Sequence, residues 1–190
     1  MRKIWLTIIF LLLCSSIGYG QDDRPLSNKV SYKFSRQGDT YSFVGKFPVN
    51  NNINCLMDII YDFEHLKRFN SGVDNVELIR QDSHSYEVRY SYRKLFLKAK
   101  TTFRRVLDKK RRIVTSVMIG HEQNSNLIPK PLASHGYYRI IEDKTGCWFE
   151  YFRECEIESK PLDRLYFYIA EKEAIKHLLT IKEYIEKTCP

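Results

Sequence analysis

The sequence predicts an α+β domain in which a bent antiparallel β-sheet of about seven strands packs against one long C-terminal helix. Between residues 41 and 156, most segments alternate apolar and polar side chains and are separated by short turns. Residues 162–187 then contain neither Gly nor Pro, and their apolar side chains recur at helical spacing. An antiparallel sheet needs a cover on one face, and this helix can supply it.

The chain before the main sheet divides into three segments. Residues 21–39 are polar with little periodicity, which predicts a loose leader with room for a short strand at residues 32–34. Residues 41–47 alternate as in a half-buried strand, which Pro48 ends. Residues 52–69 change to helical spacing and predict one helix, or two short helices with a bend.

Six further strands are expected before the terminal helix. Asp108 to Arg111 reads as a hairpin tip. A longer loop is expected over residues 121–133, which contain two prolines. The six strands cover residues 76–79, 86–93, 95–104, 112–120, 136–141 and 147–156.

Strand alternation predicts which side chains face the helix. A register slip of one residue would invert every assignment. The inward set is Tyr86, Tyr90, Leu97, Phe103 and Val117, and the outward set is Glu87, Arg89, Lys98 and Lys100. Because successive strands reverse direction, the 121–133 loop and the helix start near Leu162 are expected at one end of the domain. The tip at residues 109–112 is expected at the other end.

Residues 1–20 have the three parts of a cleavable secretion signal. Arg2 and Lys3 form a basic start, residues 4–13 are apolar apart from one threonine, and Gly18 and Gly20 supply small side chains before a cut after Gly20. We therefore predict export, to a periplasm or outside the cell. Removing this segment lowers the net charge from +8 to +6.

Two alternatives to cleavage are a membrane anchor and a lipoprotein signal at Cys14. The apolar segment is too short for a bilayer core of about 30 Å. Leu13 is bulky where a lipoprotein signal needs a small residue before the cysteine. Neither alternative is favoured.

Four cysteines remain after cleavage, and three full pairings exist. Cys147 and Cys155 lie eight residues apart on one strand, about 26 Å, so they cannot bond each other. The cysteine and histidine spacings fit no metal site, and we expect no cofactor. The other two cysteines are Cys55 and Cys189.

Catalytic motifs are lacking in the sequence: there is no GxSxG, no HExxH and no glycine-rich phosphate loop. Strand alternation places Tyr151 and Arg153 on one face. If that face lines a cavity, Arg153 could hold a carboxylate or phosphate headgroup; otherwise it is an exposed arginine at the sheet margin.

The densest basic cluster is expected on the solvated outer face of the sheet, because its lysines alternate with apolar residues. Export argues against nucleic acid as a partner. The candidate contact with an anionic membrane surface is the hairpin tip, Lys109, Lys110, Arg111 and Arg112. The rest of the cluster is Lys94, Lys98, Lys100, Arg104 and Arg105.

The order of elements resembles the helix-grip fold of the START and birch-pollen-allergen superfamily (SRPBCC), which includes polyketide cyclase/dehydrase-like proteins. Residues 54–69, NCLMDIIYDFEHLKRF, look like the family's helical stretch, and residues 73–78, VDNVEL, resemble its second strand. The likeness covers residues 41–188. It implies a START-like domain over residues 40–190, with the bent sheet wrapped around the terminal helix and a cavity between them.

The resemblance also implies a ligand and a disulfide. Members bind sterols, phospholipids, fatty acids or other apolar molecules in the cavity. The short helices of the fold hold the far end of the terminal helix, which would bring Cys55 near Cys189, with Cys147 as a competing partner. The expected cavity lining is Tyr86, Tyr90, Tyr92, Leu97, Phe103, Val117, Tyr151, Arg153, Leu165 and Ile169.

The residues and the resemblance together leave three alternative functions. The first is an exported, non-enzymatic binding protein that shelters a lipid or other apolar small molecule, since each buried methylene contributes about 0.8 kcal/mol. The second is a cyclase/dehydrase-like enzyme that uses cavity tyrosines and an acid, and the third is an interaction domain with a filled core. Two or more ionisable groups buried in the cavity would favour the enzyme.

Overall fold

The computed structural model describes residues 24–27, 30–49, 52–70, 72–94, 97–144 and 146–189. The expected secretion signal at residues 1–20, including Cys14, lies outside the described residues, so export stays a prediction. Among the helices of the described part, none has the length and apolar character needed to cross a bilayer.

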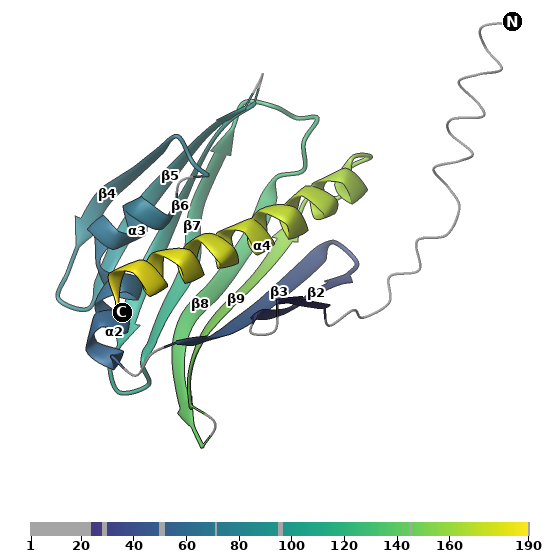
Figure 1. The fold of residues 1–190 in the computed structure, drawn as a ribbon. Helices are drawn as coiled ribbons and strands as arrows, with labels where there is room; N and C mark the ends of the chain where they lie inside the picture. Colours follow the sequence, from purple (N-terminus) through teal and green to yellow (C-terminus); the bar gives the residue numbers. More distant parts are fainter. Residues whose placement is uncertain are drawn as a thin grey trace, which may run out of the picture.

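The described residues form one antiparallel sheet of nine strands in the order β1-β2-β3-β9-β8-β7-β6-β5-β4, which confirms the expected fold class (Figure 1). Strand β3 pairs with β9, so the first long strand lies beside the last. The strands are β1 (Arg24–Ser27), β2 (Val30–Gln37), β3 (Thr40–Val49), β4 (Asn75–Gln81), β5 (Ser85–Lys94), β6 (Leu97–Asp108), β7 (Ile113–Gln123), β8 (Pro131–Asp143) and β9 (Gly146–Ile157).

The leader is more ordered than expected, because β1 and β2 belong to the sheet. Strand β2 pairs with β3 along its length. Tyr32 stacks on Phe43 with ring centroids 5.9 Å apart, and Phe34 stacks on Tyr41 at 5.5 Å. The short strand expected at residues 32–34 lies within β2, but the prediction of a loose leader was wrong for β1 and for the rest of β2. Cross-strand aromatic pairs and the open edge of β3 outweigh the polar composition of β2.

The helical segment after β3 is two short helices with a bend, α2 (Ile53–Tyr61) and α3 (Phe63–Phe69). Asp62 makes the bend. Its backbone N–H donates to the Asp58 carbonyl at the end of α2, while its side chain accepts from the N–H groups of Glu64 and His65 at the start of α3. One residue thus ends one helix and caps the next.

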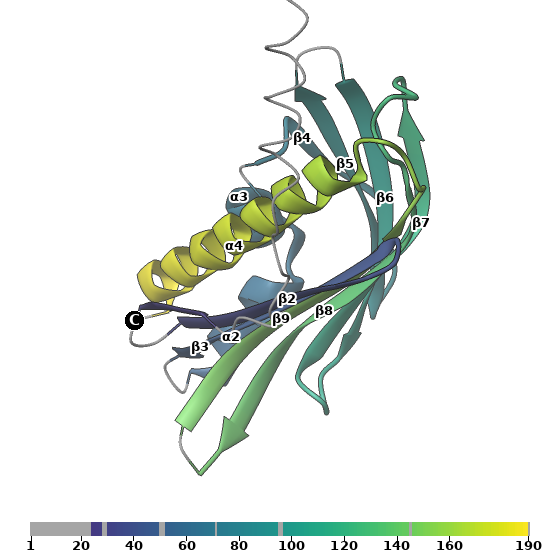
Figure 2. The same cartoon turned by 90° about the vertical axis from the view of Figure 1, so that its right-hand side faces the viewer.

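The terminal helix α4 (Asp163–Thr188) lies along the concave side of the sheet, as expected (Figure 2). It packs against β3 at Gly45, where an added Cβ would come within 2.5 Å of the Leu178 side chain. Its buried residues are Phe167, Leu178, Ile181 and Ile185. Leu165 and Ile169, expected to line the cavity, are instead 54 % and 48 % exposed, because the buried stripe of the helix follows the other four residues.

The facing of most strand residues is confirmed. Tyr86, Tyr90 and Phe103 are buried, Leu97 is half-buried, and Lys98 and Lys100 are exposed. Glu87 and Arg89 are half-buried, and Arg89 Nη1 lies 3.8 Å from Glu77 Oε2.

Val117 was assigned wrongly, because it is 51 % exposed. On both sides of Val117 in β7, the alternate positions Val114, Ser116 and Met118 are buried or half-buried, so Val117 belongs to the opposite set. Its partner across the sheet is the exposed Arg104, whereas Met118 pairs with the buried Phe103. The face of β7 is therefore set by its pairing with β6 rather than by which of its residues are apolar.

The two ends of the domain are arranged as expected. The loop between β7 and β8, which is shorter than expected and covers residues 124–130, contacts the segment before α4. Lys160 Nζ donates to the Asn126 carbonyl at 3.0 Å, and the Glu158 N–H donates to the Lys130 carbonyl at 2.8 Å. At the other end, Arg112 Nη1 donates to Glu142 Oε2 at 2.6 Å.

A disulfide joins Cys55 in α2 to Cys189 after α4, as the resemblance implied, with Cα atoms 6.1 Å apart and a sequence separation of 134. Cys147 and Cys155 are buried free thiols. In the chain-entropy account, closing so long a loop stabilises the fold by roughly 5 kcal/mol. The disulfide therefore holds the C-terminal end of α4 against α2.

We expect that Cys55→Ala/Cys189→Ala lowers the free energy of unfolding by roughly 3–5 kcal/mol, because the unfolded chain regains loop entropy. Urea denaturation with and without reductant measures this. Reductant should destabilise the parent protein and leave the double variant unchanged. Equal stability of the oxidised and fully reduced parent would contradict the role of the disulfide.

Candidate functional site

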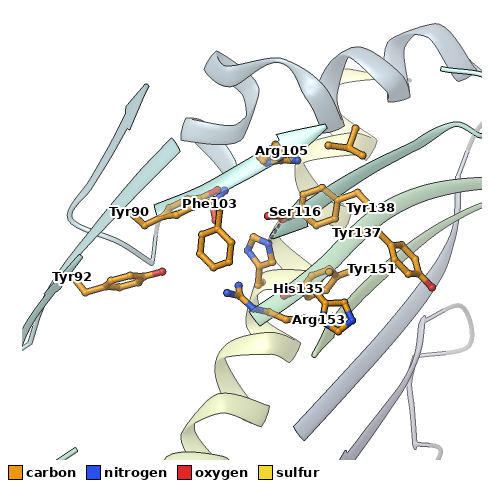
Figure 3. A pocket seen from close by; sticks show the side chains of 14 residues that line it. Tyr90, Tyr92, Phe103, Arg105, Ser116, His135, Tyr137, Tyr138, Tyr151 and Arg153 are labelled. Carbon is orange, nitrogen blue, oxygen red and sulfur yellow. Dashed lines mark hydrogen bonds between the residues drawn. The ribbon is translucent and has the colours of Figure 1, made fainter. Parts of the chain in front are cut away.

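The candidate site is a cavity of about 50 Å³ between the concave face of the sheet and α4. We call it the arginine chamber, because two arginines reach it. Figure 3 shows that its wall side chains come from separate strands and converge on one space. The chamber is defined by Tyr90, Tyr92, Phe103, Arg105, Ser116, Tyr138, Tyr151, Arg153 and His177.

Strand alternation places these side chains together. Tyr90 and Tyr92 lie two residues apart on β5, and Phe103 and Arg105 do so on β6, so each pair shares a face. On β9, Tyr151 pairs directly with Tyr138 of β8. Because the sheet curves around α4, the inward faces of five strands meet at a chamber that His177 of α4 also lines.

Arg105 is only 2 % exposed and is the largest fully buried side chain of the described residues. Its Nη2 donates to the carbonyl of Ile60 in α2 at 2.7 Å. Its guanidinium carbon lies 5.0 Å from the ring centroid of Tyr138 and 5.5 Å from that of Tyr86. The Nε has no hydrogen-bond partner among the described residues. Aromatic faces, one carbonyl and the Tyr90 hydroxyl thus surround this cation.

Arg153 enters the chamber from β9. Its Nε donates to Ser134 Oγ at 3.2 Å, and its guanidinium carbon lies 4.8 Å from the Phe103 ring centroid. The side chain is half-buried, so part of it remains reachable from the cavity. The sequence left two placements open for Arg153, and the structure places it on the cavity wall.

His177 is the titratable group that α4 contributes to the chamber. Its Nε2 lies 2.8 Å from the Tyr138 hydroxyl. Burial, and then the positive charges of Arg153 and Arg105, lower the pKa of His177 to about 3. At neutral pH the imidazole is therefore uncharged, and its unprotonated nitrogen can accept the hydrogen bond of the Tyr138 hydroxyl.

The tyrosines of the chamber also keep one protonation state at neutral pH. Burial raises the pKa of Tyr92 to about 12. Burial likewise raises the pKa values of Tyr90, Tyr138 and Tyr151, although nearby arginines act in the opposite direction. The chamber therefore contains neutral hydroxyl groups, a neutral imidazole and two permanent cations.

Half of the ten expected cavity residues lie at the chamber. Tyr90, Tyr92, Phe103, Tyr151 and Arg153 line it. Tyr86 is buried beside Arg105, outside the lining, and Leu97 is half-buried elsewhere on β6. Val117, Leu165 and Ile169 are exposed and line no part of the chamber, so their assignment to the cavity wall was wrong. A role of the lining residues in binding stays a prediction.

Sequence reasoning missed Arg105, Tyr138 and His177. Arg105 was assigned to the basic outer cluster, yet it continues the alternation that places Phe103 inward. Its charge suggested an exposed side chain, whereas its position in the strand indicated a side chain that points into the interior. His177 lies next to the buried Leu178 on α4. This neighbour was a weak sign that His177 belongs to the wall of the cavity.

A larger hollow of about 630 Å³ lies over the ends of strands β4 to β7. Its lining includes Lys98, Lys100 and Glu122, which are exposed. Lys98 and Lys100 belong to the outward set, whereas Tyr92 lines both this hollow and the chamber. The chamber is the better candidate for a ligand site, because aromatic and charged side chains of several elements converge on it.

The hairpin tip remains an exposed basic segment. Lys109 and Lys110 are exposed. Arg111 Nε lies 3.7 Å from Asp108 Oδ2, and Arg112 Nη1 lies 2.6 Å from Glu142 Oε2. Two of its four cations thus have acidic neighbours. Contact with an anionic membrane stays a prediction.

No family model and no curated protein matches the sequence. Solved structures do share its fold. A STAR-related lipid transfer protein from Xanthomonas axonopodis is 10 % identical with a TM-score of 0.63, covering 90 % of this chain and 99 % of that one. Human StAR-related lipid transfer protein 5 is 9 % identical with a TM-score of 0.62, covering 98 % and 95 %.

An enzyme shares the fold as well. The Zhui aromatase/cyclase from Streptomyces sp. R1128 is 13 % identical with a TM-score of 0.61, covering 78 % of this chain and 94 % of that one. Together these structures show that the chain has the helix-grip fold of the START superfamily, as the sequence predicted. At such low identities they establish the fold and leave the function to the site.

The lowered pKa of His177 predicts a pH-dependent stability. Between about pH 6.5 and 3 the unfolded chain binds a proton that the folded chain does not, so the free energy of unfolding should fall as the pH falls through this window. The slope from this residue is at most about 1.4 kcal/mol per pH unit.

His177→Gln should flatten this part of the profile, because glutamine keeps an acceptor for Tyr138 but does not titrate. Urea denaturation from pH 7 to pH 4 measures the difference. His84→Gln, at an exposed position just before β5 and outside the chamber lining, is the matched control. Parallel profiles for the parent and His177→Gln would contradict a buried neutral imidazole.

Proposed function

We propose that this chain is an exported, non-enzymatic carrier that shelters an apolar small molecule or lipid between the sheet and α4. The observation that carries the proposal is the arginine chamber, a partly enclosed space with an aromatic wall on the concave face of the sheet. Support for the ligand class comes from the fold, which the chain shares with two proteins named for lipid transfer. The expected secretion signal supports export.

The chamber accommodates only part of such a ligand. A volume of about 50 Å³ holds about four water-sized groups, whereas sites for whole small molecules measure roughly 300–1,000 Å³. Binding therefore requires the space between α4 and strands β5 to β7 to widen. We place one end of the ligand in the chamber and the rest along this widened space.

A cyclase/dehydrase-like enzyme is the second candidate. One observation favours it: the chamber lining contains ionisable groups of the kind used in catalysis, among them Arg105, Arg153, His177 and several tyrosines. Two further observations count against it. The chamber lining includes no carboxylate, and an imidazole with a pKa of about 3 is a weak base at neutral pH. Binding is therefore the function that the site supports better.

Filling the chamber should abolish binding. Ser116 is a small side chain on the chamber wall, and we expect Ser116→Phe to lower the affinity for a bound lipid at least tenfold by occupying the ligand's space. Thr115→Phe is the matched control, because Thr115 is the exposed neighbour on the other face of β7.

Native mass spectrometry of protein purified from its own compartment is the measurement. We expect a bound small molecule in the parent and in Thr115→Phe and none in Ser116→Phe. An unchanged mass of the ligand after prolonged incubation supports a carrier, and a changed mass supports the enzyme. Retention of the ligand by folded Ser116→Phe would contradict the proposed site.

A further inference from the structure

We propose that the arginine chamber binds the carboxylate of an apolar organic acid, so that the sheltered ligand is an anionic amphiphile rather than a neutral lipid. This inference rests on the proposed function and specifies the chemistry of the bound end of the ligand.

The first support is the charge balance of the chamber. Within the described residues, neither Arg105 nor Arg153 forms an ion pair with a carboxylate. The acidic residues outside the described part are Asp22 and Asp23, both at the N-terminal end. Buried charges in proteins are normally paired, so two arginines that share a cavity without an acid leave a place for a negative charge.

The buried carboxylate of Glu150 shows how the same protein balances a buried charge elsewhere. Glu150 is 2 % exposed and lies on β9 between Phe149 and Tyr151, facing away from the chamber. Its Oε1 accepts from Arg139 Nη2 at 2.5 Å, and its Oε2 lies 2.6 Å from Lys46 Nζ. This acid has two cationic partners, whereas the chamber arginines have no anionic partner among the described residues.

The second support is the set of hydrogen-bond donors around the cavity. A guanidinium has five N–H donors and binds a carboxylate through two parallel hydrogen bonds. Arg105 donates to the Ile60 carbonyl and to the Tyr90 hydroxyl. Arg153 donates to Ser134 Oγ and to the Tyr151 hydroxyl, so each guanidinium keeps further N–H groups. Both side chains line the cavity, so other donors can reach an oxyanion placed there. The aromatic rings beside them stabilise a cation without neutralising it.

The third support is size. Room for about four water-sized groups suits a carboxylate, which has three heavy atoms, and excludes a sterol ring system or a phosphocholine headgroup. Tyr151 at the wall keeps a neutral hydroxyl group that can donate to an anion, while His177 carries no competing charge at neutral pH. The surroundings thus favour a small oxyanion over a cation or an apolar group.

The test compares ligands that differ only at the polar end. Isothermal titration calorimetry of the parent protein with dodecanoate, dodecanol, dodecyl phosphate and acetate should rank dodecanoate first. We expect dodecanoate to bind at least tenfold more tightly than dodecanol and at least a hundredfold more tightly than acetate.

Two substitutions assign this preference to the chamber. Arg153→Met should lower the affinity for dodecanoate at least tenfold and change that for dodecanol less than twofold. Arg104→Met, next to Arg105 but exposed on the other face of β6, should change neither affinity. The ligand-free Arg153→Met protein should unfold at the same temperature as the parent or above it, because the change removes an unpaired charge. A structural arginine would give the opposite thermal shift.

Each of the other outcomes contradicts a specific part of the proposal. Equal affinities for dodecanoate and dodecanol would overturn the anionic inference and leave the carrier standing. Tighter binding of dodecyl phosphate would replace the carboxylate with a phosphate, and acetate as tight as dodecanoate would replace the amphiphile with a free anion; either result overturns the proposal as stated. Binding of none of the four would overturn both the inference and the proposed function.

Discussion

The packing of α4 on β3 determines where a ligand can lie. Leu178 occupies the space above Gly45, where a larger residue would displace the Leu178 side chain. The disulfide then fixes the C-terminal end of α4 to α2. With the helix held close to β3, the curved sheet leaves the chamber between α4 and strands β5 to β9. Any ligand must adapt to this side of the helix.

The chamber combines a largely aromatic wall with two positive charges. Its wall is largely aromatic, which suits an apolar ligand, yet two arginines point into it without a carboxylate partner among the described residues. The groups that could move protons are held in one state, because burial and the arginines keep His177 neutral and burial keeps the tyrosines protonated. Such a site is better prepared to hold an anion than to transfer a proton.

The sequence predicted those features that a short-range pattern determines. Alternation placed Tyr90, Tyr92 and Phe103 correctly, and helical spacing located α4 to within about one residue at each end. Sequence reasoning failed where the placement of a residue or strand depends on a partner that is distant in the chain. The strand β2 depends on the open edge of β3, and the facing of Val117 depends on the register of β7 with β6. The burial of Arg105 depends on the carbonyl of Ile60, which no local pattern reveals.

The central claim is that the protein carries an apolar acid whose carboxylate lies between Arg105 and Arg153. The most direct measurement is solvent extraction of the protein purified from its own compartment, followed by mass analysis of the extract. The account predicts an organic acid in about one-to-one ratio with protein, seen in negative-ion mode and lost from Arg153→Met. Recovery of a neutral lipid in that ratio, or of the same acid from Arg153→Met in equal amount, would contradict it.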